Sequence, residues 1–148
     1  MRNKKLFRKW LLSATALAAL FSTAASAYAN PVINENPKGT YGYSITNTYF
    51  NFDNYGFMEA GPPMDAWKFT YSGSASPAIN FSVDTTGAFG GFVIYDTTYS
   101  GVSTAVFSPS SITPGSHVYS LPLVTSHQYT IYVQPTGPIQ YNYHFSLY

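Results

Sequence analysis

Large and small side chains alternate along much of the chain after residue 30. In residues 66–71, for example, three large aromatic side chains alternate with Lys68 and Thr70. The same period of two recurs in residues 79–83, 129–133 and 139–147. Because successive side chains of a strand point to opposite faces of its sheet, each stretch would present one apolar and one polar face. The pattern predicts antiparallel strands that are buried on one side.

Weaker strand signals and frequent turns extend this pattern to a small all-β domain. Less regular apolar runs lie at residues 40–49, 92–95, 104–107 and 117–121. Glycine and proline, which favour turns, recur between the runs about every 8 to 14 residues. We therefore predict one domain, residues 30–148, folded as an antiparallel, jelly-roll-like β-sandwich of about eight strands. The stretch from Asn51 to Pro63 is the least strand-like part, and we interpret it as a loop.

The first 29 residues have the three-part pattern of a secretory signal peptide. Five basic residues lie within the first nine positions, an uncharged apolar stretch runs from Leu11 to Phe21, and small residues follow it. We expect a helical signal that is cleaved after Ala29, or alternatively after Ala27. The apolar stretch of about 11 residues is too short to cross roughly 30 Å of hydrocarbon, so we expect no membrane anchor. The sequence thus predicts a secreted, extracellular protein.

Residues 30–148 carry few charges and many aromatic rings. Their net charge is −4, because they contain six carboxylates and only two basic residues, Lys38 and Lys68. Nucleic acid and anionic membranes attract clustered Lys and Arg, so we expect neither as a partner. The chain has no cysteine, which excludes a disulfide framework and a zinc–thiolate site and, with the long basic signal, points to a bacterial exporter. With 18% aromatic residues, the core is expected to consist largely of Tyr and Phe.

Four segments between about residue 64 and the end of the chain carry a resemblance to a known family. Asp65–Phe69 places an Asp before alternating aromatic residues, Phe92–Asp96 is an apolar run that ends in an Asp, and residues 129–133 and 141–145 are alternating runs on either side of a Pro- and Gly-containing turn. These segments resemble the opening strand, the central strand and the closing hairpin of bacterial pre-peptidase C-terminal domains. One departure is Ser126-His127-Gln128, where the family usually has a glycine.

The resemblance implies a particular kind of protein. Pre-peptidase C-terminal domains are small β-sandwiches exported with secreted peptidases and other hydrolases, and some members bind calcium or collagen. A binding or accessory module is therefore implied for this chain, without a named ligand.

Aromatic residues in the first third of the domain are candidates for a binding surface. Phe52, Tyr55 and Phe57 fall in the least strand-like stretch. Rings on a loop or a flat face can stack on sugars or fill apolar grooves, so these three would form a platform for a polysaccharide or an extracellular protein. The alternative is burial, because a chain with few Leu, Ile and Val has to build its core from such rings. Burial is favoured most strongly for Trp67.

Acidic residues of the same stretch are candidates for a calcium site. Asp53, Glu59 and Asp65 lie within 13 positions and offer hard oxygen ligands on the expected loop. Their spacing matches no known calcium loop, so solvated acids are the alternative. Paired carboxylates could also serve glycoside hydrolysis, but a small sandwich offers little cleft for a sugar chain. We expect no cofactor, and calcium is the alternative that these acids leave open.

No catalytic arrangement stands out from the sequence. Serines and three histidines are present, but the Gly-x-Ser-x-Gly motif is absent. We therefore expect a non-enzymatic module that acts in adhesion, matrix attachment or binding of a polymer substrate. One alternative is a self-associating structural protein of an extracellular matrix or of a spore or cell surface, which low charge and tyrosine-rich edge strands would favour. Another is a small secreted hydrolase or inhibitor.

Overall fold

The computed structural model describes residues 30–34, 45–58, 64–73, 76–86, 90–109, 111–134 and 140–148. Ten strands lie in these ranges: β1 (Val32–Asn34), β2 (Ile45–Asn47), β3 (Asp53–Met58), β4 (Asp65–Thr70), β5 (Ala78–Val83), β6 (Phe92–Asp96), β7 (Thr104–Phe107), β8 (Gly115–Ser120), β9 (Gln128–Val133) and β10 (Tyr141–Leu147). None of the described residues belongs to a helix that could cross a membrane. The predicted signal peptide, residues 1–29, lies outside the described residues, so its cleavage stays a prediction.

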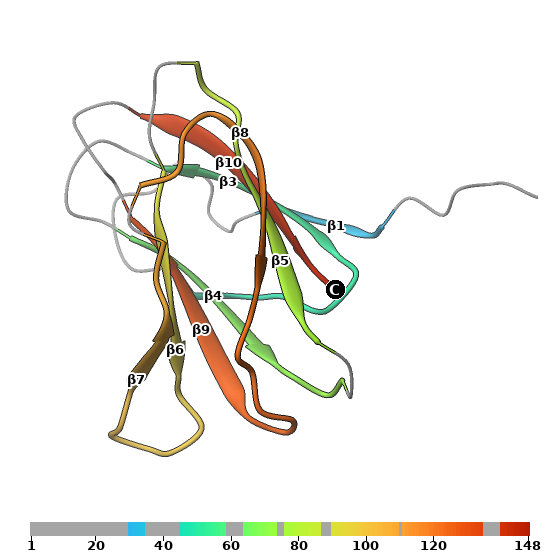
Figure 1. Cartoon of the computed structure of the whole chain (residues 1–148), viewed down its shortest axis with the longest axis vertical. Coiled ribbons are helices and arrows are strands. Elements are labelled where there is room, and N and C mark those ends of the chain that lie inside the picture. The colour runs from blue at the N-terminus through green and yellow to red at the C-terminus, as the bar shows by residue number, and fades with distance from the viewer. Residues whose placement is uncertain are drawn as a thin grey trace, which may run out of the picture.

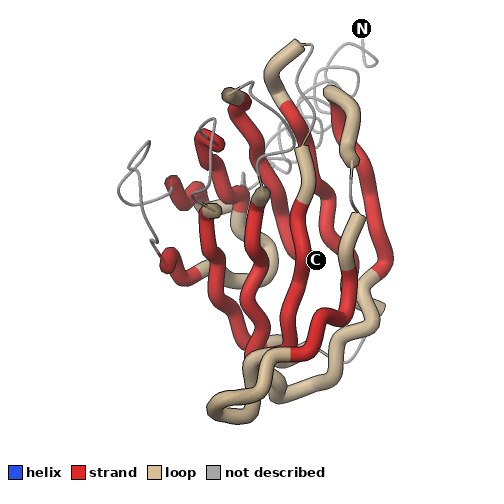
Figure 2. The backbone as a smooth tube through the Cα atoms, turned by 90° about the vertical axis from the view of Figure 1, so that its left-hand side faces the viewer, coloured by secondary structure: helices blue, strands red, loops and turns tan. Residues whose placement is uncertain are grey.

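The strands form two five-stranded sheets that pack face to face (Figures 1 and 2). Sheet A has the strand order β1-β3-β10-β5-β8, and sheet B has the order β2-β4-β9-β6-β7. From β3 to β10 the chain crosses between the sheets at every connection except the one between β6 and β7. This is the eight-stranded, two-sheet plan of a jelly roll. The predicted β-sandwich is therefore confirmed.

Two short strands at the margins run parallel to their neighbours. β1 pairs with β3, and β2 pairs with β4, each through three residues. Parallel neighbours cannot be joined by a tight hairpin. Here the chain passes from β1 to β2 in the other sheet before it returns to β3. The predicted antiparallel pairing holds for β3 to β10, and the margins add two parallel pairs that alternation along the chain does not reveal. The expected hairpin of residues 129–133 with residues 141–145 is wrong, because β9 pairs with β4 and β6 in sheet B and β10 pairs with β3 and β5 in sheet A.

Strand β3 corrects the prediction of a loop between Asn51 and Pro63. It lies between β1 and β10, with six residues in register with β10. Its inward, buried positions are Asn54, Gly56 and Met58, and its outward positions are Asp53, Tyr55 and Phe57. The usual alternation is thus nearly inverted, with most of the large apolar rings on the outside. A pattern that expects large apolar side chains on the inward face cannot recognise this strand.

The unusual inward residues of β3 each have a packing reason. A Cβ atom on Gly56 would overlap the ring of Tyr143, so the absence of a side chain lets β10 fill this part of the core. Asn54 accepts a hydrogen bond from the Thr48 hydroxyl, and its amide donates to the carbonyl oxygens of Phe52 and Phe145. A buried polar side chain is tolerated when it is hydrogen-bonded in this way.

Aromatic rings fill the space between the sheets. The largest fully buried side chains include Trp67, Tyr129, Tyr141, Tyr143, Phe81, Phe92 and Phe145. Trp67 of sheet B meets Phe145 of sheet A edge to face, with ring centroids 5.2 Å apart. The indole Nε1 of Trp67 donates to the Tyr143 hydroxyl at 2.9 Å, and that hydroxyl donates to Asp65 at 2.8 Å. The predictions of a Tyr- and Phe-rich core and of a buried Trp67 are confirmed.

Candidate binding surface

The outer face of sheet B consists of the residues that alternate with the buried set. Its outward positions on the central strands are Ala66, Lys68 and Thr70 on β4, Thr130 and Tyr132 on β9 with Gln128 and Gln134 at its ends, and Val93 and Tyr95 on β6. Lys68 is the one charged residue among these positions. Amides, hydroxyls and tyrosine rings make up most of the rest, so the face is polar but nearly uncharged.

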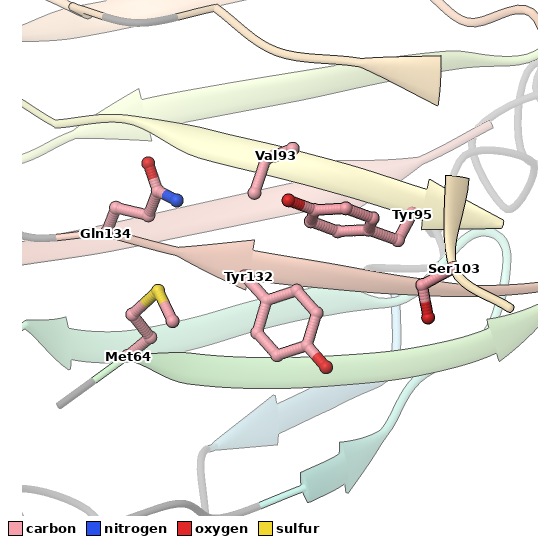
Figure 3. A pocket seen from close by; sticks show the side chains of 6 residues that line it. All are labelled: Met64, Val93, Tyr95, Ser103, Tyr132 and Gln134. Atoms are coloured by element: carbon pink, nitrogen blue, oxygen red, sulfur yellow. The ribbon is translucent and has the colours of Figure 1, made fainter. Parts of the chain in front are cut away.

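Two tyrosines from neighbouring strands form a hollow on this face. Tyr95 of β6 and Tyr132 of β9 place their ring centroids 5.7 Å apart, with the ring planes at 80°. The hollow has a volume of about 260 Å³, and its other lining residues are Met64, Val93, Ser103 and Gln134. Figure 3 shows Met64 and Gln134 at one end of the two rings and Ser103 at the other. This tyrosine hollow combines aromatic surface with amide and hydroxyl groups.

The strand register makes room for the two rings. Tyr132 lies between Ala66 of β4 and Val93 of β6, both much smaller than tyrosine. The pairing of β6 with β7 shifts register between Ile94 and Tyr95. Such irregularities bend a strand and re-aim its side chains, and they are frequent beside functional sites. The tyrosine hollow therefore follows from small residues on both sides of Tyr132 and a register shift in the pairing beside Tyr95.

A second hollow lies farther along the same face. It is lined by Asn47, Tyr49, Lys68, Phe69, Thr70 and Gln128, with a volume of about 350 Å³. Strand β9 contributes to both hollows, through Tyr132 in the first and Gln128 in the second. At roughly 3.3 Å per residue, these two positions are about 13 Å apart along the strand. This lysine hollow and the tyrosine hollow thus follow one line across the sheet.

A side-chain network joins the end of β6 to the start of β9. The His127 Nδ1–H donates to Asp96 at 2.6 Å, and the Thr98 hydroxyl and backbone N–H donate to the other carboxylate oxygen at 2.6 and 3.0 Å. The Thr98 hydroxyl bond, more than the His127 bond, lowers the pKa of Asp96 from 3.8 to about 2 against an opposing effect of burial. The network anchors the start of the segment that carries Ser103 to the tyrosine hollow.

The aromatic residues predicted as a platform lie elsewhere, in sheet A. Tyr55 and Phe57 face outward from β3, and Tyr55 is 40% exposed. Its ring stacks on the imidazole of His144 at 5.3 Å, and the Nδ1–H of His144 donates to Asp84 at 3.0 Å. Phe52 precedes the strand and packs against Tyr49 instead. The structure thus brings Tyr55 and Phe57 to one face without Phe52, and ligand binding there stays a prediction.

The acids predicted as calcium ligands are divided between the sheets. Asp53 lies on the outer face of sheet A and accepts a hydrogen bond from the Asn30 amide at 3.2 Å. Asp65 begins β4 in sheet B and accepts the bond from Tyr143. Glu59 lies outside the described residues. Within the described ranges, no three Asp, Glu, His or Cys side chains are grouped so that they could hold a metal ion. Calcium binding stays a prediction.

Comparison with known proteins shows the fold. No model of a protein family matches the chain, and no curated protein matches its sequence. Among solved structures, the chain is similar to the pre-peptidase C-terminal domain of collagenase from Bacillus anthracis, with a TM-score of 0.53 and 12% identity, over 74% of this chain and 100% of that one. It is also similar to CorA, a surface-associated copper-binding protein of Methylomicrobium album BG8, with a TM-score of 0.53 and 8% identity, over 72% and 99% of the two chains.

The fold is of the pre-peptidase C-terminal type. The resemblance predicted from the sequence is therefore confirmed at the level of architecture. Sequence identities of 12% and 8% show a shared fold but do not allow the role of a residue to be transferred from these proteins to this chain. The properties of the candidate surface come from the side chains of this chain alone.

The tyrosine hollow is the feature that sequence reasoning missed. Tyr132 alternates with the buried residues Tyr129, Ile131 and Val133 of β9, so it lies at a position where the alternation predicts a polar side chain. Tyr95 likewise lies in the outward phase of the neighbouring strand. A large ring at an outward position of a predicted strand indicates a candidate binding residue. Only the pairing of β6 with β9 shows that the two rings meet.

Proposed function

We propose that this chain is a secreted, non-catalytic binding module that holds a neutral polysaccharide on the outer face of sheet B. The observation that carries the proposal is the tyrosine hollow, in which two rings set at 80° line a cavity of about 260 Å³. Sugar rings present C–H groups that pack on aromatic faces, and the hydroxyl groups around them need hydrogen-bond partners. The hollow offers both kinds of contact.

The near neutrality of the face favours a sugar over a charged polymer. Nucleic acid or an acidic polysaccharide would require several cations, and Lys68 is the one charged group at the outward positions of the described strands of sheet B. The amide of Gln134 offers a donor and an acceptor in the tyrosine hollow, and the amides of Gln128 and Asn47 do so in the lysine hollow. Such groups match the uncharged hydroxyls of a neutral glycan.

The two hollows favour a chain over a single sugar. They are about 13 Å apart along β9, so a linear polysaccharide lying along this strand would contact both. The first would stack one sugar on the exposed tyrosine surface, and the second would offer Lys68 and Gln128 to hydroxyls farther along. We therefore expect affinity to rise with the length of the oligosaccharide until both hollows are filled.

The similar structures support a non-catalytic module. One is the pre-peptidase C-terminal domain of a collagenase, and the other is a surface-associated copper-binding protein. The predicted signal peptide supports action outside the cell, where a polymer-binding domain would meet its ligand.

Retention on insoluble polysaccharides tests the proposal. The purified protein is mixed with cellulose, chitin and xylan particles, and with collagen fibres as the protein alternative. We expect retention on at least one polysaccharide. Tyr95→Ala and Tyr132→Ala should each weaken it by about tenfold, because each removes one stacking surface.

Tyr55→Ala is the matched control, because it removes an exposed tyrosine from the outer face of the other sheet. Its retention should equal that of the unmodified protein. Loss of retention in Tyr55→Ala alone would move the site to the platform predicted from the sequence. Retention on collagen only, or on none of the four materials, would overturn the proposal of a polysaccharide ligand.

A further inference from the structure

In the described part of the chain, strand β8 forms one margin of sheet A and has features of an edge that could pair with another strand. The margins of the two sheets are β1 and β8 in sheet A and β2 and β7 in sheet B. β8 has six residues, whereas the other three have three or four. Figure 1 shows it beside β5 at the border of its sheet. Among the marginal strands of the described chain, β8 is the one long enough to accept a full additional strand.

The hydrogen-bond alternation of β5 shows which backbone groups of β8 point outward. Ala78 and Tyr148 exchange both backbone bonds, at 2.7 and 3.0 Å, so the even-numbered residues of β5 bond towards β10. Its odd-numbered residues therefore bond to Gly115, His117 and Tyr119 of β8. It follows that the N–H and C=O groups of Ser116, Val118 and Ser120 point away from β5.

The side chains of the same three residues are exposed. Ser116, Val118 and Ser120 project from the outer face of sheet A, and Val118 is 62% exposed. Natural edge strands are commonly protected by Lys, Pro or a bulge. β8 contains none of these: its sequence is Gly-Ser-His-Val-Tyr-Ser, and its ladder with β5 runs in register over all six residues.

The strand is also complementary to itself. If two copies pair antiparallel with Val118 on the two-fold axis, Ser116 of each lies opposite Ser120 of the other. Val118 then meets Val118, serine meets serine, and no like charges face each other across the axis. Serine side chains that face each other across antiparallel strands can hydrogen-bond. The three outward residues of one copy and the three of the other would together form about six backbone hydrogen bonds.

We propose that β8 pairs with β8 of a second copy and joins two A sheets into one continuous sheet. The two-fold axis of an antiparallel pair is perpendicular to the sheet, so both B sheets would face the same side. The inference goes beyond the proposed function, because the dimer forms whether or not a polysaccharide binds. It would place two tyrosine hollows on one face, where they could engage one surface together.

The oligomeric state of the protein tests the inference, and the substitutions that should weaken the dimer are all at Val118. Sedimentation of the purified protein up to about 1 mM, where even a weak edge interface is populated, should show a monomer–dimer equilibrium. Val118→Lys should weaken it by about tenfold or more, because two positive charges would meet on the axis. Val118→Pro should weaken it similarly, because it removes an outward N–H without touching the ladder to β5.

Two further samples make the test specific for this register. Val124→Lys adds the same charge at another exposed valine outside the strands, and it should dimerise as the unmodified protein does. A mixture of Val118→Lys with Val118→Glu should restore dimers, because opposite charges then meet on the axis. The inference is overturned if the unmodified protein stays monomeric, if the Val118 variants dimerise normally, or if the mixture fails to restore pairing.

Discussion

Gly56 shows how one residue determines the packing between two strands. It lies opposite Tyr143 in the β3–β10 ladder, and the Tyr143 ring occupies the space that a Cβ atom would take. The glycine is therefore required for close approach rather than for a special backbone angle. Its neighbour Asn54 is equally specific, because its amide hydrogen bonds hold the start of β3 against β10.

Gly56→Ala should destabilise the protein strongly. The added methyl group collides with the Tyr143 ring inside a full core, and overpacking of this kind costs typically about 1–3 kcal/mol or more. Urea unfolding measures the free energy of unfolding. Gly101→Ala is the comparison, because its site has open space and only a positive φ of 78°, for which a cost of about 1–2 kcal/mol is expected. A smaller loss at Gly56 than at Gly101 would contradict this account of the core.

Asp96 is the carboxylate whose environment is most clearly altered. Its pKa is lowered to about 2, first by the Thr98 hydroxyl and then by His127. A carboxyl group with a lowered pKa in the folded state stabilises the fold above its ordinary pKa of 3.8, and this contribution is lost as the pH falls from about 4 towards 2. The network at the base of the 97–103 segment should therefore weaken in acid.

NMR titration of the Asp96 carboxyl carbon measures this effect directly. We expect a midpoint near pH 2 in the unmodified protein. Thr98→Val should raise it most, because that hydroxyl supplies the largest lowering effect, and His127→Phe should raise it less. The reverse order, or a midpoint near the ordinary value in the unmodified protein, would show that the network does not hold Asp96 as described.

At the scale of elements, the two sheets are joined by a chain of polar groups inside an aromatic core. Trp67 of β4 donates to the hydroxyl of Tyr143 on β10, which donates back to Asp65 of β4. β4 belongs to sheet B and β10 to sheet A, so these hydrogen bonds cross the interior of the sandwich. They fix the register between the sheets, which non-directional apolar packing alone would leave less specific.

Tyr143→Phe should lower the free energy of unfolding by about 1–3 kcal/mol. The change leaves the ring in place but deprives the buried indole N–H of its acceptor, and an unsatisfied buried donor costs about this much. Tyr55→Phe, on the outer face of sheet A, should change stability by less than about 0.5 kcal/mol. Equal effects of the two changes in urea unfolding would argue against a role for the buried hydroxyl.

The elements differ in how far the sequence predicts them. β4, β5, β9 and β10 follow from alternation, because their inward positions carry large apolar residues. β3 does not, because packing against Tyr143 and hydrogen bonding place glycine and asparagine on its inward face. The tyrosine hollow could not be predicted from the sequence for another reason. Its two rings lie far apart in the sequence, and only strand pairing brings Tyr95 beside Tyr132.

At the scale of the whole molecule, the sandwich separates two different outer faces. Sheet A carries the Tyr55–His144 stack on its outer face and β8 at its margin, and the outer face of sheet B carries both hollows. Binding and self-association would therefore use different surfaces. Pairing through β8 would leave both tyrosine hollows open, so a dimer should bind a polysaccharide surface more tightly than its Val118→Lys monomer.

The position of the ligand on the molecule tests the central claim most directly. Backbone amide NMR signals of the labelled protein are followed while soluble oligomers of the polysaccharide that retains it are added. We predict shifts along β4, β6 and β9, centred on Tyr95 and Tyr132 and extending towards Gln128 with longer oligomers. Shifts confined to β3, β5 and β10 of sheet A would contradict the assignment of the binding surface to sheet B.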